Sequence, residues 1–352
     1  MNDTTTAFRP MSLGEILDKA FRLYRQYFLK LIGIYAIPFI PIMVIQILVT
    51  TFLTSNLVSS GGINSRSTVM GFAVMAVVVA MIAGIAYLIL VSGFATAALT
   101  RAVSNGLTGK PVDILESYRS IAASGMNLVG ALIMGIILLF VVLIWALIPI
   151  VGWFTGPGIF MFLMLIVYPL LAPVIALENQ GAVSAIRRSW DLGRTRFWWL
   201  IGFTVVLALL GQLIVTGPIY LMSALLQGAL SAVSEVSVEM QMSISNLISG
   251  LTNIMLNLLY MPLQLTMFVV VYFDLRARNE GLDLALQLAP AADEAAEVQI
   301  MPEIRGTTMP FFTGMDLGRF ALLSLMAMML FGLYFVFIFF ILAIIGLGAS
   351  GL

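Results

Sequence analysis

Residues Leu31–Leu53 read LIGIYAIPFIPIMVIQILVTTFL and contain no charged side chain. A helix needs about 20 predominantly apolar residues to cross the hydrocarbon core of a bilayer, so this run is typical of a membrane span. Comparable runs recur along the chain and predict seven spans in all: Leu31–Leu53, Val69–Leu99, Leu128–Ile150, Ile159–Leu177, Phe197–Leu226, Leu247–Phe273 and Phe320–Leu347. The sequence therefore predicts an all-α fold, a polytopic transmembrane helical bundle.

The composition agrees with this class. The chain has 352 residues, of which 61% are hydrophobic and 10% are charged, whereas a soluble domain has about 45–50% apolar and about 25% charged residues. Cysteine and histidine are both absent, which excludes thiol chemistry and removes the commonest general base and nitrogen ligand. We expect no cofactor and no metal. Because the net charge is zero, no basic field favours nucleic acid as a partner.

The basic residues predict an orientation. Lysine and arginine are enriched in the cytoplasmic loops of membrane proteins. With the N-terminus placed in the cytoplasm, 16 of the 17 basic residues fall on the cytoplasmic side and only Arg66 lies outside. We therefore expect a multi-pass protein of the cytoplasmic membrane with its C-terminus outside.

Residues 151–158 are uncharged and rich in glycine and proline, which break helices, so we expect a turn there between the third and fourth spans. A tight hairpin whose two spans both cross the bilayer is one interpretation. The other is a re-entrant pair that never crosses. Both leave the sidedness of the remaining loops unchanged.

An internal repeat is visible around the first and fifth spans. Residues 19–33 and 188–202 share a pattern of basic, aromatic and Leu-Ile-Gly positions, and a weaker copy begins at Tyr118. This pattern predicts a membrane domain, residues 1–287, built from three units of about 1–110, 111–180 and 181–287, each an interfacial helix followed by two spans. A flexible cytoplasmic linker is expected over 288–312 and a C-terminal transmembrane helix over 313–352.

The first interfacial helix has clear signals. Ser12 and Glu15 form a capping-box pattern, and apolar residues recur three and four positions apart after it. Such an amphipathic helix lies in the headgroup plane with its basic side near anionic lipid. The candidates for lipid-headgroup or partner contact are Lys19, Arg22, Arg25, Arg187, Arg188, Arg194, Trp198 and Trp199. The alternative is that these residues are only the ordinary positive flanks of spans.

Uncharged polar residues inside the spans suggest a second site. Asn253 and Asn257 lie four positions apart on one helical face, with Gln264 seven positions further. They either line a small polar cavity or hydrogen-bond between helices. Small residues at Ala73, Ala76, Ala80 and Ala83, and at Gly93 and Ala97, predict close helix contacts. Alternating apolar residues over 236–244 suggest an extended segment or an interfacial flap.

Three stretches resemble a known family. Residues 11–25, 178–198 and 272–281, with Glu178-Asn179, Arg187-Arg188 and Tyr272-Phe273-Asp274, resemble bacterial proteins grouped with the membrane domain of glycerophosphoryl diester phosphodiesterases. The resemblance covers roughly residues 9–290 and implies an all-helical bacterial membrane domain. The hydrolase of that name is a separate barrel that uses histidines and a metal. Because this chain has no histidine, phosphodiesterase activity is not expected.

No nucleophile elbow, phosphate loop or dinucleotide fingerprint occurs in the sequence. The leading hypothesis is therefore a non-enzymatic membrane protein that organises lipids or partner proteins, including other membrane proteins or a second copy of itself. The alternative is a permease-like transporter of a lipid or other apolar solute, suggested by parallel repeats and by prolines within spans. An enzyme acting on lipid headgroups is the third and weakest hypothesis.

Overall fold

The computed structural model describes residues 10–59, 66–231, 237–281, 310 and 313–349. Within these ranges every regular element is a helix, and seven stretches are long and apolar enough to cross a membrane. They are Phe28–Leu53, Met70–Leu107, Ser124–Trp145, Val151–Glu178, Phe197–Leu230, Met240–Glu280 and Gly314–Val336. Each overlaps one predicted span, so the predicted fold class is confirmed. The predicted linker lies almost entirely outside the described residues.

Three short helices each lead into a candidate span through one non-helical residue. The pairs are α1 (Leu13–Gln26) with α2 (Phe28–Ser59), α5 (Ile114–Ser120) with α6 (Ala122–Trp145), and α9 (Ala182–Thr195) with α10 (Phe197–Gly211). The intervening Tyr27, Ile121 and Arg196 have φ of −114°, −107° and −126° with ψ of 23°, 8° and 44°. This sparsely populated backbone region turns the chain between two helices without a longer loop.

Three of the candidate spans contain a π-helical segment. The segments are α3 (Arg66–Ala86), η3 (Tyr87–Ala95) and α4 (Thr96–Leu107); α7 (Val151–Phe162), η4 (Leu163–Val167) and α8 (Tyr168–Glu178); and η5 (Gln212–Thr216) and α11 (Gly217–Ser231), which continue α10. Two long helices complete the chain, α12 (Val238–Glu280) and α14 (Gly314–Ala349).

The expectation of an extended segment was wrong for residues 238–244, because the Ser237 side chain accepts a hydrogen bond from the Met240 amide and caps α12.

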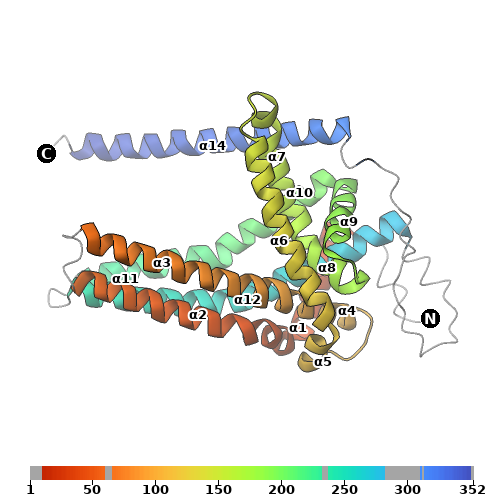
Figure 1. Cartoon of the computed structure of the whole chain (residues 1–352), viewed down its shortest axis with the longest axis horizontal. Helices are drawn as coiled ribbons and strands as arrows, with labels where there is room; N and C mark the ends of the chain where they lie inside the picture. Colours follow the sequence, from red (N-terminus) through yellow and green to blue (C-terminus); the bar gives the residue numbers. More distant parts are fainter. Residues whose placement is uncertain (1–9, 60–65, 232–236, 282–309, 311–312, 350–352) are drawn as a thin grey trace.

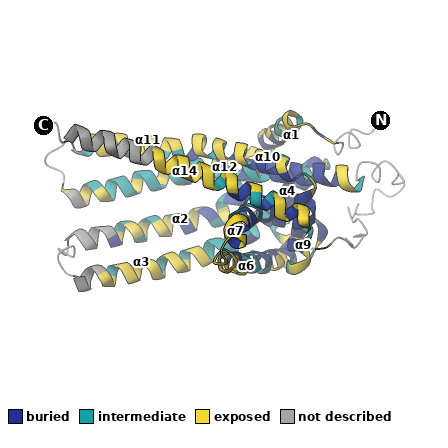
Figure 2. Cartoon of the chain, turned by 90° about the horizontal axis from the view of Figure 1, so that it is seen from above, coloured by how far each residue is buried: buried dark blue, intermediate teal, exposed yellow. Residues whose placement is uncertain are grey.

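The helices run in two directions. In Figure 1, α2, α3, α11, α12 and α14 lie lengthwise, whereas α6 and α7 cross them steeply. Figure 2, turned by 90° about the horizontal, shows α7 nearly end-on while α2 and α3 remain lengthwise. The two views agree, so α6 and α7, which belong to the third and fourth candidate spans, are oriented differently from α2 and α3.

The core is concentrated at one end of the molecule. Residues Val269–Leu275 of α12 are at most 2% exposed, and α4, α8 and α9 are among the helices that contact α12. We call this the charged end, because Glu178, Arg188 and Arg276 meet there. Figure 2 shows the buried residues gathered at that end, while the long helices leading away from it are mostly exposed.

The two predicted small-residue contacts have different outcomes. A Cβ atom on Gly93 would lie 2.6 Å from Val129 Cγ2 of α6, so a close helix contact at this position is confirmed. Ala73, Ala76 and Ala80 are exposed on α3, so the close contact predicted at these three positions is wrong within this chain, whereas Ala83 is partly exposed and Ala97, predicted together with Gly93, is fully buried. The lack of bulky neighbours there follows from the position of α3 at the margin of the bundle (Figure 1).

Candidate functional site

Helix α1 is held by its cap and by one buried face. Ser12 and Glu15 form the predicted capping box. Ile16, Ala20, Leu23 and Tyr24 are buried, and the Tyr24 hydroxyl donates to the carbonyl of Leu259 on α12. Burial raises the pKa of Tyr24 to about 12, so its hydroxyl keeps the proton that makes this bond at neutral pH.

The rest of α1 faces outward and combines apolar with basic side chains. Leu13 and Phe21 are exposed hydrophobic residues, and Arg22 and Arg25 are exposed beside them, while Lys19 is partly exposed. At 100° per residue, Phe21 lies between the buried face and the arginines. A helix with this distribution can place Phe21 in the apolar layer and Arg22 at the headgroups.

The arginines of α9 lie in a different environment, because carboxylates within the protein engage them. Arg187 pairs with Asp191 across 3.1 Å. Arg188 pairs with Glu178 across 3.1 Å and also with Glu280. Arg194, 9% exposed in its side chain, pairs with Asp191 across 2.9 Å. The positions predicted for lipid contact therefore divide into an exposed group on α1 and an internally paired group on α9.

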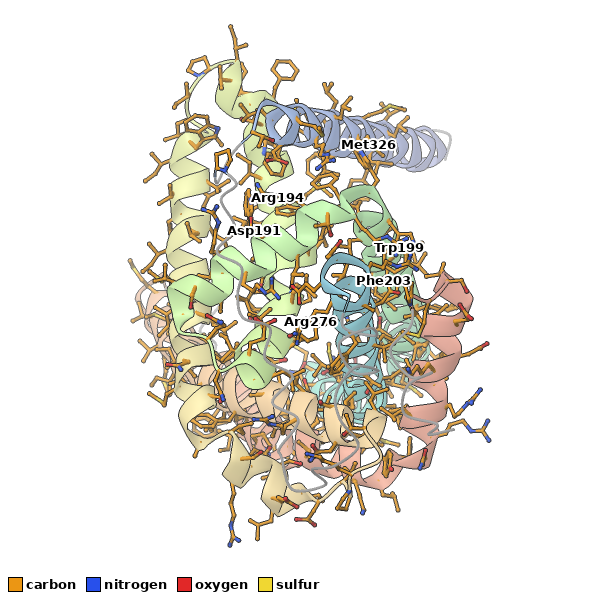
Figure 3. All side chains as sticks on the ribbon, turned by 90° about the vertical axis from the view of Figure 1, so that its right-hand side faces the viewer. Asp191, Arg194, Trp199, Phe203, Arg276 and Met326 are labelled. Atoms are coloured by element: carbon orange, nitrogen blue, oxygen red, sulfur yellow. The ribbon has the colours of Figure 1, made fainter. Side chains whose placement is uncertain are left out.

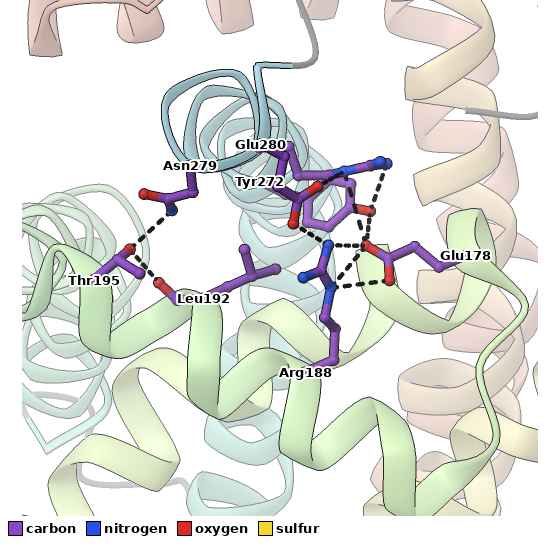
Figure 4. Close-up of polar contacts among 8 residues, drawn as sticks. Glu178, Arg188, Leu192, Thr195, Tyr272, Asn279 and Glu280 are labelled. Atoms are coloured by element: carbon purple, nitrogen blue, oxygen red, sulfur yellow. Dashed lines mark hydrogen bonds and ion pairs between the residues drawn. The ribbon is translucent and has the colours of Figure 1, made fainter. Parts of the chain in front are cut away.

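A buried cluster joins three helices at the charged end (Figure 4). Glu178, at the end of α8, accepts hydrogen bonds from both Nε and an Nη of Arg188 on α9 and from the Tyr272 hydroxyl on α12 at 2.6 Å. Arg276, 1% exposed, lies 3.9 Å from Glu178 and 2.9 Å from Glu280. Two guanidinium groups thus face two carboxylates, and the cluster is neutral.

The cluster is electrostatically self-consistent. Burial lowers the pKa of Arg188, but the Glu178 and Glu280 carboxylates outweigh this effect and raise the pKa above its ordinary value. Arg188 therefore stays positively charged and is a counterion for both Glu178 and Glu280. Burying an ion pair is costly unless its lone pairs and protons are satisfied, and here the Tyr272 hydroxyl supplies one of the additional hydrogen bonds.

A second set of contacts ties the start of the described chain to α12. Asp274, fully buried, faces Arg196 at 3.2 Å and Arg278 at 3.0 Å. Its other oxygen accepts a 2.7 Å hydrogen bond from the Met11 amide, and Arg278 donates to the Met11 carbonyl at 2.7 Å. The beginning of α1 is therefore fixed at the charged end.

A third set holds α14. Arg194 lies 3.7 Å from Asp316 and donates to the Pro310 carbonyl, and Arg319 donates to the Arg194 carbonyl at 3.2 Å. Figure 3 views this end and shows Asp191 and Arg194 on α9, beneath α14. Phe320 of α14 packs edge-on against Trp190 at 5.7 Å between ring centroids. Both ionic and aromatic contacts thus dock the start of α14.

The two tryptophans predicted to contact lipid differ from each other. Trp198 is 43% exposed. Trp199 lies under the guanidinium of Arg196, 4.3 Å from its ring centroid, and stacks on Phe203 at 5.4 Å. Figure 3 labels Trp199 and Phe203 together on α10. Trp199 is therefore engaged by its own chain, whereas Trp198 faces outward.

The predicted polar positions of α12 bond locally. The Asn257 amide donates to the Asn253 carbonyl at 2.9 Å and to its side-chain oxygen at 3.1 Å. Asn253, Asn257 and Gln264 are all partly exposed. The structure brings the two asparagines together within one helix; the polar cavity stays a prediction.

Sequence reasoning did not assign a role to Glu178, Tyr272, Asp274, Arg276 or Glu280, although all five lie in the motifs quoted above. The signal that could have found them is their position, because each is a polar group within about two turns of the end of a long apolar run. Among the described residues, no group of three or more acidic, histidine or cysteine side chains is placed to hold a metal ion. The ion pairs and hydrogen bonds at the charged end connect α8, α9 and α12 to one another, and the outward face of α1 remains exposed.

Comparison with known proteins adds no relative. No family model matches the chain, and neither a curated protein nor a solved structure does.

Proposed function

We propose that this protein organises lipids or partner proteins at a bacterial cytoplasmic membrane through its interfacial helix α1, without catalysing a reaction. The observation that carries the proposal is the outward face of α1, where exposed Phe21 lies beside exposed Arg22 and Arg25. Basic residues close to an anionic leaflet contribute about 1 kcal/mol each. The buried face of α1 fixes this surface on the bundle.

The paired arginines of α9 narrow the proposal. An anionic headgroup that bound Arg188 would have to displace Glu178 and Glu280 from a largely buried guanidinium. Arg22 and Arg25 on α1 are exposed, and binding of a headgroup there requires no such exchange. We therefore assign lipid contact to Arg22, Arg25 and Trp198, and a structural role to Arg187, Arg188 and Arg194; contact of Lys19 with lipid stays a prediction from the sequence.

The three matching junctions at Tyr27, Ile121 and Arg196 support the proposed three-unit organisation of the chain. The proposed orientation places the charged end in the cytoplasm. The relationship to the membrane domain of glycerophosphoryl diester phosphodiesterases stays a proposal that depends on the sequence motifs.

Native mass spectrometry of protein purified in detergent tests the lipid assignment. Replacing Arg22 and Arg25 together by Gln removes two charges, so the affinity for a phosphatidylglycerol probe should fall roughly tenfold to thirtyfold. The Arg22→Lys, Arg25→Lys variant keeps both charges and should retain the lipid. Equal lipid and partner retention by the Gln variant and the unmodified protein would refute the proposal.

A carrier for a lipid or other apolar solute is the second candidate. The observation in its favour is the π-helical turn found in three of the seven candidate spans, at η3, η4 and η5, because such turns often mark functional sites. Flux of a labelled lipid across proteoliposomes that is lost on Asn257→Leu would support it. Flux no faster than in protein-free vesicles would exclude it for that lipid.

A further inference from the structure

The hairpin formed by α6, α7 and the residues between them is apolar throughout. Residues 122–177 contain no charged side chain. Large hydrophobic residues are exposed along α6 and around the tip, including Ile137, Phe140, Leu147 and Trp153. An exposed apolar surface of this extent is unstable in water. The hairpin must therefore lie in hydrocarbon.

The depth of the hairpin follows from its contact with α14. A Cβ atom on Gly158 of α7 would lie 2.0 Å from the Phe320 carbonyl oxygen, and the Gly158 amide donates to the Ser324 hydroxyl at 2.6 Å. Phe320 is only four residues, about 6 Å of helix, beyond Asp316, which lies beside Arg194 at the charged end. Gly158 is therefore close to the charged end.

A crossing hairpin would place Gly158 elsewhere. Gly158 and Glu178 are 20 residues apart, which is about 30 Å of helix and equals the thickness of the hydrocarbon core. If α7 and α8 crossed the bilayer together from Glu178, Gly158 would reach the opposite interface. Its contact with Phe320 keeps it near the side on which Glu178 lies.

The other end of the hairpin is also fixed at the charged end. The Ser124 hydroxyl, at the start of α6, donates to the Asn179 side chain at 3.1 Å. The helices α6 and α7 then run across the direction of α2, α3, α12 and α14 in both Figure 1 and Figure 2. If those four helices cross a bilayer, α6 and α7 lie along its plane.

We propose that the α6–α7 hairpin is a wedge embedded in one leaflet, that of the charged end, and that it makes the protein bend membranes or accumulate on curved ones. Helix α6 has 24 residues and α7 has 12, so at about 1.5 Å per residue they are about 36 Å and about 18 Å long, and at a width of about 10 Å they add on the order of 500 Å² to one leaflet. The opposite leaflet receives no such insertion from these helices. Because the leaflet at the charged end gains the larger area, the membrane should bend so that this leaflet lies on the convex side.

The chain has no cysteine, so single-cysteine variants test the depth directly. Sealed proteoliposomes of defined orientation are treated with a membrane-impermeant maleimide from either side. Arg66→Cys, at the start of α3, and Arg25→Cys, on α1, mark the two sides. Leu147→Cys at the hairpin tip should not react from the Arg66 side. Labelling of Leu147→Cys from that side means that the hairpin crosses, and it overturns the proposal.

Tryptophan fluorescence covers the case in which Leu147→Cys reacts from neither side. A variant that keeps Trp153 and carries phenylalanine at the other four tryptophan positions is placed in lipids brominated at different depths. Quenching strongest near the headgroup region supports the wedge. Quenching strongest at the bilayer centre indicates a re-entrant hairpin and overturns it.

A charge scan gives a matched comparison. Ile137 on α6 and Val78 on α3 are both exposed near the middle of an apolar helix. Lysine at Val78 lies deep in a crossing helix and should lower the yield of inserted protein at least tenfold. Lysine at Ile137 can extend to the interface and should change the yield less than about threefold. Equal losses would contradict the proposal.

Curvature is measured on membrane tubes pulled from giant vesicles that contain the fluorescently labelled protein in one orientation. The protein with the charged end outside should be enriched several-fold on narrow tubes. Protein reconstituted in the opposite orientation is the control and should be depleted. Equal density on tube and vesicle for both orientations overturns the bending activity, whatever the lipid affinity of α1.

Discussion

At the scale of single residues, Glu178 connects three helices at the charged end. Its buried carboxylate faces Arg188, Arg276 and the Tyr272 hydroxyl. Glu178→Gln keeps the shape but removes the charge, which leaves two buried guanidinium groups short of a counterion. We expect a loss of about 3–5 kcal/mol in the free energy of unfolding, measured by denaturant titration in detergent.

Glu116→Gln is the matched control for this change. Glu116 is exposed on α5, and a surface substitution of this kind changes stability by less than about 0.5 kcal/mol. Indistinguishable unfolding curves for the two variants would show that the cluster does not stabilise the fold.

Arg188 tests whether geometry as well as charge matters in the cluster. Its Nε and Nη groups contact Glu178 while the same guanidinium also reaches Glu280. Lysine offers one compact ammonium and cannot reproduce this fork. Arg188→Lys should therefore cost about 1–3 kcal/mol, whereas Arg25→Lys on the exposed face should be neutral in the same unfolding assay. A neutral Arg188→Lys would contradict the bidentate role.

At the scale of elements, the close approach of α7 and α14 depends on one glycine. The missing Cβ of Gly158 makes room for the Phe320 carbonyl. Gly158→Ala should separate the two helices and destabilise their contact by about 1–3 kcal/mol. Gly332→Ala, on α14 and with nothing within 4 Å of the added Cβ atom, is the control. A protease should cleave the chain before α14 faster in Gly158→Ala than in Gly332→Ala or in the unmodified protein. Equal cleavage rates in all three proteins would contradict the prediction.

The elements also show what the sequence could and could not predict. Long apolar runs located all seven candidate spans, because periodicity and length depend only on local sequence. The capping box at Ser12 was found for the same reason. The partners of Arg188 were not predictable, because Glu280 is 92 residues away and only the fold brings it close. The direction of α6 could not be predicted from the sequence. An uncharged apolar helix has the same sequence pattern whether it crosses the membrane or lies in its plane.

At the scale of the whole molecule, the distribution of basic residues predicts the orientation. Arg22, Arg25 and the paired arginines of α9 all belong to segments expected in the cytoplasm, whereas Arg66 begins α3 at the opposite end. In intact bacterial cells, an impermeant maleimide should label Arg66→Cys and leave Arg25→Cys unlabelled until the cells are opened. The unmodified chain gives no background, because it has no cysteine. Labelling of Arg25→Cys in intact cells would mean that the orientation in the membrane is the reverse of the predicted one. Helix α1 and the α6–α7 hairpin would then contact the opposite leaflet.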